Sequence, residues 1–231
     1  MFNFKNIASG STGNCYLVST LSGSFLLDAG VKKLDKIIEN VNLNDLDFAF
    51  ISHNHKDHSM QKEKLATRGV CVVDGNLIQD FTKIGSKGLK SGLFSLWCFP
   101  LEHGNEKSSA IIIKDTLDNE LILYATDFNN WTYDLSQFKF TRVIVECNYI
   151  EGLVVNATNK IRSMDNIDRH LGLNGTKRFI NQLNISNLKE IILCHQSQNF
   201  GDSVMMGTSI FNEFDIPVKV CRQYGGVDYY G

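Results

Sequence analysis

Three histidines and an aspartate stand close together in the segment ISHNHKDHS, residues 51–59. They are His53, His55, Asp57 and His58, and they include half of the six histidines in the chain. Imidazole and carboxylate groups are common ligands of divalent metal ions. In an extended chain, alternate residues project the same way, so His53 and His55 can hold one ion. Asp57 and His58 follow where the chain turns and can face a second ion.

Three further candidate ligands end other apolar, strand-like runs. His103 follows FSLWCFPL (94–101), Asp127 ends ELILYATD (120–127), and His195 ends EIILCH (190–195). Strand ends that meet at one edge of a sheet bring such side chains together. We expect His103 to complete the first ion site and His195 the second, with the two oxygens of Asp127 between them.

This ligand set predicts two divalent metal ions as cofactors. Imidazole with carboxylate and no thiolate favours Zn²⁺, with Mn²⁺ or Fe as alternatives, and an open position for water on each ion is typical of a catalytic site. Two ions about 3.5–4 Å apart can hold a hydroxide between them and stabilise an in-line displacement at phosphorus. Asp57 is a candidate to orient that hydroxide as well as to bind metal.

The rest of the chain alternates strand-like and helical patterns. Helical spacing occurs in residues 31–41, with Leu34, Ile37, Ile38 and Val41 on one face, and more weakly in 176–183 and 202–214. Two sheets packed face to face with helices outside would suit this order. Short apolar runs predict strands at 14–19, 24–30, 47–52, 69–74, 94–101, 110–114, 120–127, 142–148, 190–195 and 217–222.

The motif His53-x-His55-x-Asp57-His58 resembles the signature of the metallo-β-lactamase superfamily. SGSTGNC (9–15), LLDAG (26–30) and the order of the later ligands extend the resemblance over nearly the whole chain. It implies an α/β fold, a four-layer αββα sandwich, with the two metals at one sheet edge. The chain looks most like small single-domain phosphodiesterases, which include bacterial DNA exonuclease-like proteins and phage-type enzymes that hydrolyse cyclic nucleotides. The β-lactam hydrolases are less similar, since they often have a cysteine where Asp127 stands.

The resemblance also implies roles for two residues outside the ligand set. Asp28, in LLDAG, resembles the buried carboxylate that accepts a hydrogen bond from the metal loop and fixes the ligand tautomers. His170, in DRHLG, resembles a late histidine that does not bind metal but contacts phosphate or protonates the leaving oxygen. A loop histidine with a local hydrogen bond is the alternative for His170. One departure is Gln196 after His195, where the family pattern has leucine.

Other polar residues are candidate substrate contacts. The glycine-rich segment SGSTGN could cradle a phosphate with its backbone N–H groups, but a hairpin turn explains the same residues and is favoured. Glu146, which ends RVIVECN, either orients groups near the site or only ends a strand. The aromatic tail YGGVDYY (224–230) could stack on a base, cover a neighbouring subunit or, most commonly, close a core. The candidate contacts are Ser11, Asn14, Asn148 and Ser197.

Composition limits the partners. The chain has 231 residues, a net charge of −2 and no basic tail, and pairs such as Lys32–Lys33 are read as a solvated face. A long polyanion therefore gains no support from charge. Six scattered cysteines, the lack of a signal-like start and the lack of a long apolar run predict a cytoplasmic protein that does not enter a membrane. We expect a single hydrolase domain over 1–231, and the resemblance makes a homodimer plausible.

Together these observations predict a phosphodiesterase with two metals and a metal-bridging hydroxide, acting on a nucleotide such as a cyclic nucleotide. A DNA or RNA exonuclease of the same fold is the main alternative, with a nucleic-acid end as its substrate. A thioester or lactone hydrolase would require an apolar pocket over the metals. A metal-bound regulator without turnover is disfavoured by the complete ligand set.

Overall fold

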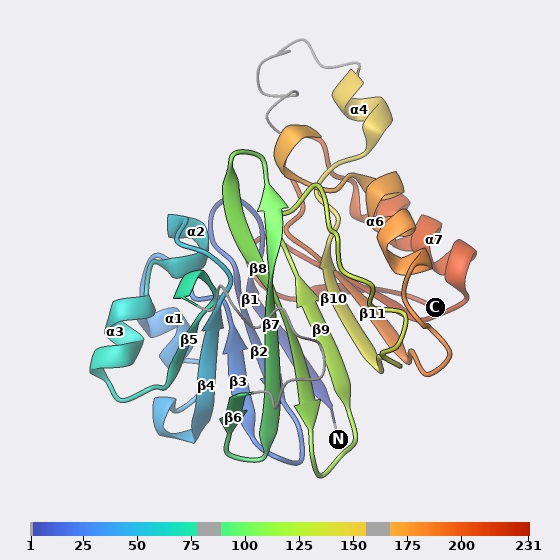
Figure 1. Ribbon diagram of the computed structural model, residues 1–231. Coiled ribbons are helices and arrows are strands. Elements are labelled where there is room, and N and C mark those ends of the chain that lie inside the picture. Colours follow the sequence, from blue (N-terminus) through green and yellow to red (C-terminus); the bar gives the residue numbers. More distant parts are fainter. Residues whose placement is uncertain (1, 78–88, 156–166) are drawn as a thin grey trace.

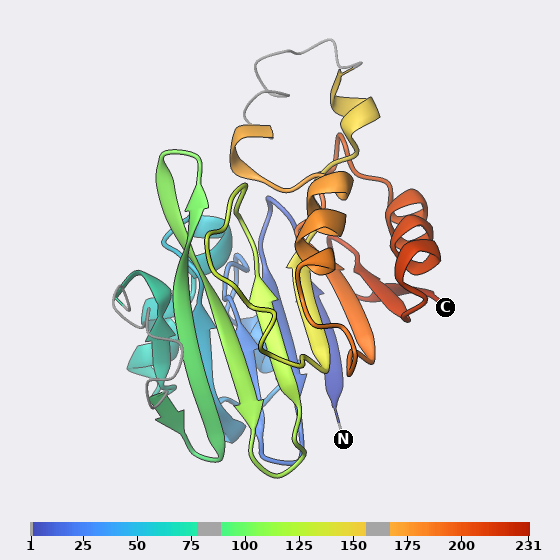
Figure 2. The ribbon, with the colours of Figure 1, turned by 45° about the vertical axis from the view of Figure 1, so that its right-hand side comes forward.

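The computed structural model describes residues 2–77, 89–155 and 167–231. Within them, two β-sheets pack face to face, with the early helices on one side and the late helices on the other (Figures 1 and 2). This is the expected αββα sandwich.

The first sheet has five strands in the order β1-β2-β3-β4-β5. Its first three strands are antiparallel, and β3, β4 and β5 are parallel. Leu34, which precedes α1, Ile37 from α1 and Leu65 from α3 pack against the outer face. The elements of this half are β1 (Asn3–Ala8), β2 (Cys15–Ser19), β3 (Ser24–Leu27), α1 (Asp35–Ile38), the 3₁₀ turn η1 (Leu43–Asp45), β4 (Leu46–Ile51), α2 (Lys56–Ser59), α3 (Lys62–Thr67), β5 (Val72–Asp74) and the 3₁₀ turn η2 (Gly75–Leu77).

The second sheet has eight strands in the order β13-β12-β11-β10-β9-β8-β7-β6. Strands β9 to β12 are parallel, and both flanks are antiparallel. Phe179 from α6 and Met206 from α7 pack on the outer face. The elements are β6 (Leu89–Ser91), β7 (Phe94–His103), β8 (Glu106–Asp115), β9 (Leu121–Ala125), β10 (Arg142–Glu146), α4 (Glu151–Val155), α6 (Leu173–Asn181), β11 (Glu190–Cys194), α7 (Ser203–Phe214), β12 (Val218–Cys221) and β13 (Val227–Tyr230).

The alternation of side chains along each strand divides the core into layers. In β8, Ile111 and Ile113 face the other sheet, whereas Ala110 and Ile112 face the helices. Between the sheets, the rings of Phe25 and Phe48 stack with centroids 4.8 Å apart. Both faces of the eight-stranded sheet are therefore buried, which explains why its strands are continuous apolar runs.

Strand direction gathers the polar strand ends at one edge of the sandwich. Strands β9, β10 and β11 are parallel, and β7 runs the same way as β9 because both are antiparallel to β8. The segments after β7, β9, β10 and β11 therefore emerge together. The loop after β4 of the other sheet meets them there, since Nε2 of His53 lies 3.6 Å from Oδ2 of Asp127.

All ten expected strands are present, and the helices expected at 176–183 and 202–214 are confirmed as α6 and α7. The helix expected over 31–41 is wrong for most of its length, since α1 spans only Asp35–Ile38 and Ile38 is 42% exposed. The Asn40 side chain donates to the Lys36 carbonyl, and this competes with the next backbone helical bond. Strands β1, β6 and β13 and helices α2, α3 and α4 were not expected. Within the described residues, no helix has the length and apolarity needed to cross a membrane.

Candidate metal centre

Asp127 lies at the centre of the polar strand ends, and three residues there adopt left-handed backbone conformations. Asp28, Asp127 and His195 have φ values of 58°, 54° and 53°. This region is uncommon for residues other than glycine, although aspartate and histidine enter it more readily than most. Each of the three follows a strand by one or two residues, so the turn re-aims the side chain as soon as the strand ends. Such conformations cluster at functional sites.

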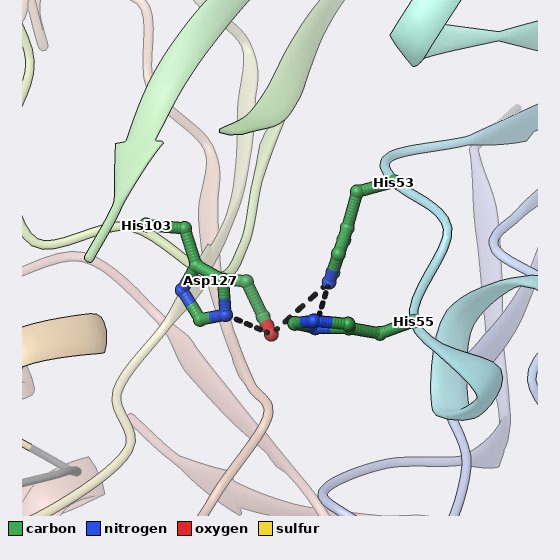
Figure 3. Close-up of side chains that lie close together, drawn as sticks. All are labelled: His53, His55, His103 and Asp127. Carbon is green, nitrogen blue, oxygen red and sulfur yellow. Dashed lines mark hydrogen bonds and ion pairs between the residues drawn. The ribbon is translucent and has the colours of Figure 1, made fainter. Parts of the chain in front are cut away.

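The first donor group consists of His53, His55, His103 and Asp127, and their ligand atoms all lie within 4.8 Å of one another. Nε2 of His53 and Nε2 of His103 each lie 3.6 Å from Oδ2 of Asp127. Nδ1 of His55 lies 2.8 Å from Nε2 of His53. Figure 3 shows the three imidazoles converging on the carboxylate, two from the loop after β4 and one from the end of β7.

The second donor group consists of Asp57, His58 and His195. Nε2 of His58 and Nε2 of His195 each lie 3.4 Å from the other oxygen of Asp127, Oδ1. Oδ2 of Asp57 lies 3.5 Å from His58 and 3.6 Å from His195. The structure thus brings together all seven candidate ligands, and the two oxygens of Asp127 face different groups.

Asp28 is fully buried beneath the loop after β4 and orients it. One of its oxygens lies 2.6 Å from Nδ1 of His58 and accepts a hydrogen bond from the hydroxyl of Tyr124 at 2.5 Å. The other accepts from the backbone N–H of Ser52. A proton on Nδ1 of His58 leaves Nε2 free for metal, which is the usual role of a carboxylate behind a metal-binding histidine.

His103 is oriented in the same way by a backbone group. Its Nδ1 lies 2.7 Å from the carbonyl oxygen of Arg169. Because a carbonyl only accepts, this nitrogen carries the proton and Nε2 presents its lone pair to the first donor group.

Burial and charge set the protonation of the site without metal. Burial, followed by the charge of His58, lowers the pKa of His53 to about 2. Burial opposes charge on His58 as well, but Asp127 and Asp28 outweigh it and raise its pKa well above the usual value. Burial also opposes charge on Asp127, yet His195 and His58 hold its pKa well below the normal range. Without metal, the centre therefore favours an anionic Asp127 beside a cationic His58 and a neutral His53.

The donors fit metal ions better than they fit one another. Nε2 of His195 is buried without a hydrogen-bond partner among the described residues, and it faces two carboxylate oxygens at 3.4 and 3.6 Å. An unpartnered buried donor or acceptor costs about 1–3 kcal/mol. A cation between these atoms would remove that cost, and five imidazoles with two carboxylates are a suitable set for two divalent ions.

His170 forms a third group of possible donors with Asp127, Glu146 and His195, and its ring centroid lies 5.0 Å from those of His103 and His195. Its Nδ1 is 2.9 Å from a carboxylate oxygen of Glu146. Glu146 is fully buried and also accepts the backbone N–H of Phe128. Burial, with the nearby charge of Asp127, raises the pKa of Glu146 to about 8. Glu146 therefore orients His170 rather than merely ending β10.

A cavity of about 180 Å³ opens beside His170 and His195, and Ser11, Asn148 and Ser197 line it. Nδ2 of Asn148 also donates to the carbonyl of His195 at 2.8 Å. The remaining candidate contact, Asn14, lies elsewhere. It is fully buried. Its side-chain oxygen accepts a hydrogen bond from the backbone N–H of Gly10, and its side-chain nitrogen lies 3.0 Å from Nε2 of His58. Asn14 is thus placed to support the loop after β4, and its segment is a hairpin turn between β1 and β2, as favoured.

Sequence reasoning missed a hydrogen-bonded chain that links the two histidines of the second group. The backbone N–H of His195 donates to the hydroxyl of Ser9, which lies 2.8 Å from the hydroxyl of Tyr16. Tyr16 donates to Oδ1 of Asn14, whose amide reaches His58. Glu106, which pairs with Nε2 of His55, was also missed. Both depend on contacts between distant segments, and no local pattern marks them.

Comparison with known proteins places this geometry in a known fold. The metallo-β-lactamase fold protein YhfI from Bacillus subtilis superposes with a TM-score of 0.69 at 18% identity, covering 99% of this chain and 100% of its own. The chain adopts the metallo-β-lactamase fold. The short form of human tRNase Z also shares this fold, with a TM-score of 0.59 at 12% identity over 84% of this chain and 93% of its own.

Sequence comparison gives a narrower result. No protein-family profile matches the chain. The exodeoxyribonuclease WalJ of Streptococcus pneumoniae is 38% identical over 61 residues, which is 25% of this chain. The match spans only 23% of the length of that curated relative. The chain therefore combines this fold with seven candidate metal ligands at one edge of the two sheets.

Proposed function

We propose that the chain is a metal-dependent phosphodiesterase that hydrolyses a phosphodiester bond in a nucleotide substrate or at a nucleic-acid end. The observation that carries this proposal is the pair of donor groups that meet on the two oxygens of Asp127. Similarity in fold to tRNase Z and the local match to an exodeoxyribonuclease support the same bond type. We also propose that residues 1–231 form one hydrolase domain of the small single-domain phosphodiesterase type.

In this proposal, His53, His55 and His103 would hold one divalent ion and Asp57, His58 and His195 would hold the other, with one oxygen of Asp127 facing each group. Zn²⁺ fits these ligands first, with Mn²⁺ or Fe as alternatives. When bound, the ions supply Lewis acidity, a lowered pKa of water and a clamp on the phosphoryl oxygens.

The chain's own residues then divide the remaining work. The carboxylate of Asp57 is 26% exposed, and we propose that it orients an attacking water from the open side of the site. His170 reaches the cavity with Nδ1 held by Glu146, which leaves Nε2 to contact phosphate or give a proton to the leaving oxygen. Ser11, Asn148 and Ser197 line the same cavity and are proposed to contact the substrate. Asp28 and Asn14 position the loop after β4.

Two substrate classes remain within this proposal. The slight net negative charge favours a small substrate such as a cyclic nucleotide. The match to an exodeoxyribonuclease favours a DNA or RNA end. A thioester or lactone hydrolase has less support, because serine, asparagine and histidine side chains line much of the cavity beside the metals. A regulator without turnover has less support because no ligand position is lost.

The test is product analysis with purified protein loaded with Zn²⁺ or Mn²⁺. The protein is given bis(4-nitrophenyl) phosphate, cyclic mononucleotides and a 5′-phosphorylated DNA, each with an Asp127→Ala control. Hydrolysis of any phosphodiester that disappears in the control supports the proposal. If the metal-loaded protein cleaves none of them but hydrolyses a thioester or lactone, the proposal is wrong.

The predicted homodimer and the predicted cytoplasmic location stay predictions. Light scattering coupled to size-exclusion chromatography measures the first directly.

A further inference from the structure

A basic groove lies beside the β1–β2 turn, separate from the cavity at the metal centre. Its volume is about 390 Å³, and it is lined by Lys32, Lys33 and Lys36, by Ala8, Val31 and Thr12, and by Gln223 and Tyr224. No acidic side chain lines it. Within the described ranges, none of the three lysines forms an ion pair, unlike Lys62 with Asp74 or Lys189 with Glu120.

The groove combines two kinds of recognition. Its lysine ammonium groups are exposed and available to anions, while Val31, Ala8 and the lysine stems provide an apolar floor. The ring of Tyr224 is 77% exposed at its wall. Cationic groups that follow a backbone, together with an exposed aromatic ring for base stacking, are the two elements used to bind single-stranded nucleic acid.

The groove is structurally joined to the metal centre. Ser11 lines the cavity at the metals and Thr12, the next residue, lines the groove. Two hydrogen bonds of Gln223 fix the wall there. Its side-chain amide donates to the hydroxyl of Thr12, and its backbone carbonyl accepts from the backbone N–H of Ser9. Ser9 in turn accepts from the backbone of His195. The Ser11–Thr12 segment of this turn therefore borders both sites.

Size also favours an extended ligand. The cavity at the metals, about 180 Å³, lies below the roughly 300–1,000 Å³ of sites that enclose a small molecule. A phosphodiester group can enter it, but the rest of a longer substrate must lie outside. The groove offers such a space, and three lysines line it.

We propose that this groove binds the single strand of a DNA or RNA substrate beyond the phosphate held at the metals. This rests on the proposed phosphodiesterase function and selects a nucleic-acid strand as its substrate class. The net charge of −2 favours a small substrate, but screening at physiological salt limits charge effects to about 8 Å, so the local lysines outweigh it at the groove.

The first test measures binding of a short fluorescein-labelled single-stranded oligodeoxynucleotide by anisotropy over a range of salt concentrations. Metal-loaded protein is used, and the oligonucleotide carries phosphorothioate linkages so that cleavage is slow. The Lys32→Gln/Lys33→Gln/Lys36→Gln variant should bind at least about tenfold more weakly at low salt. Its slope of log affinity against log salt should be shallower by about 2, since each phosphate contact on a single strand contributes about 0.7. Tyr224→Ala should weaken binding by about fivefold to a hundredfold through lost stacking.

A charge-matched control separates the groove from net charge. Lys64, Lys114 and Lys139 are exposed and do not line the groove, so their triple glutamine variant should keep the affinity and the slope. An equal loss of affinity in this control would overturn the proposal. So would an unchanged slope of log affinity against log salt in the groove variant.

Turnover separates this inference from the proposed function. With the metal-loaded protein, the groove variant should lose at least about tenfold more kcat/KM on the oligonucleotide than on bis(4-nitrophenyl) phosphate. If the wild-type protein cleaves cyclic mononucleotides but neither binds nor cuts a single strand, the proposed role of the groove is wrong and the proposed phosphodiesterase function is retained. A protein that binds the strand through these lysines but cleaves no phosphodiester would contradict the proposed function alone.

Discussion

A single methyl group on Gly30 should disable the second metal site and spare the first. Gly30 follows the Asp28 turn and packs directly against the peptide that joins Asp57 to His58. An added Cβ would overlap the carbonyl of Asp57 and lie 2.6 Å from the nitrogen of His58, whereas ordinary contact begins at 3.4 Å. Gly30 is also fixed, because its N–H donates to the carbonyl of Asn14.

The size of the effect follows from this crowding. The peptide must move by more than about 1 Å, while metal–ligand distances tolerate about 0.2 Å. Gly30→Ala should therefore lower bound metal from two ions to one per chain and reduce kcat by about a hundredfold. Overpacking should lower the free energy of unfolding by about 1–3 kcal/mol, which leaves a folded protein to measure.

The assay is metal content by mass spectrometry after gel filtration, with turnover and urea unfolding on the same sample. Gly152→Ala is the matched control, because an added Cβ there meets nothing within 4 Å among the described residues, and it should keep two ions and full turnover. A folded Gly30→Ala protein with two ions and normal kcat would refute the close packing described for this loop.

Four further predictions test the division of roles. Asp127→Ala should remove both ions and all phosphodiesterase activity, and retention of both ions would contradict the bridging role. His170→Ala should keep two ions but slow turnover by about 10²–10⁴-fold, the range for general acid–base groups, and a fall in metal content would contradict its placement outside the ligand set. Tyr16→Phe should lower the free energy of unfolding by about 1–3 kcal/mol, because Ser9 loses its buried acceptor, and should weaken binding of one ion in a metal titration. Burial and the charge of His58 lower the pKa of His53 from 6.5 to about 2, so between these values the unfolded chain binds a proton that the native site without metal does not. The free energy of unfolding of the metal-free protein should therefore fall as pH drops from 6.5 towards 2. Urea unfolding should show that this free energy depends less on pH in His53→Leu.

The sequence predicted the strands well, and it identified polar side chains that the structure brings together, because both depend on local patterns. Each candidate ligand follows an apolar run, and the parallel direction of the strands is enough to bring their ends to one edge. Histidine and aspartate are also rare enough in such positions to stand out. The length of the helix expected over 31–41 was overestimated. Apolar spacing indicates which residues are buried, but it does not show where side-chain hydrogen bonds end a helix.

The supporting contacts could not be predicted because they join distant segments. Asp28 meets Tyr124 across 96 positions, and Glu146 meets His170 across 24. The same limit applies to the groove. Lys32 and Lys33 were read as a solvated face, and only the fold places Tyr224 beside them. A sequence pattern identifies groups that can do chemistry, but the partners that orient them depend on tertiary packing.

The distribution of the ligands between the sheets links the site to the fold. His53, His55, Asp57 and His58 come from the five-stranded half, whereas His103, Asp127 and His195 come from the eight-stranded half. Each donor group contains residues from both halves. Metal ions bound there would therefore hold the edges of the two sheets together, and ligand geometry would require the sheets to keep their packing. The apolar layer between the sheets, which includes Phe25 and Phe48, would then help to keep the spacing at which Asp127 faces both groups.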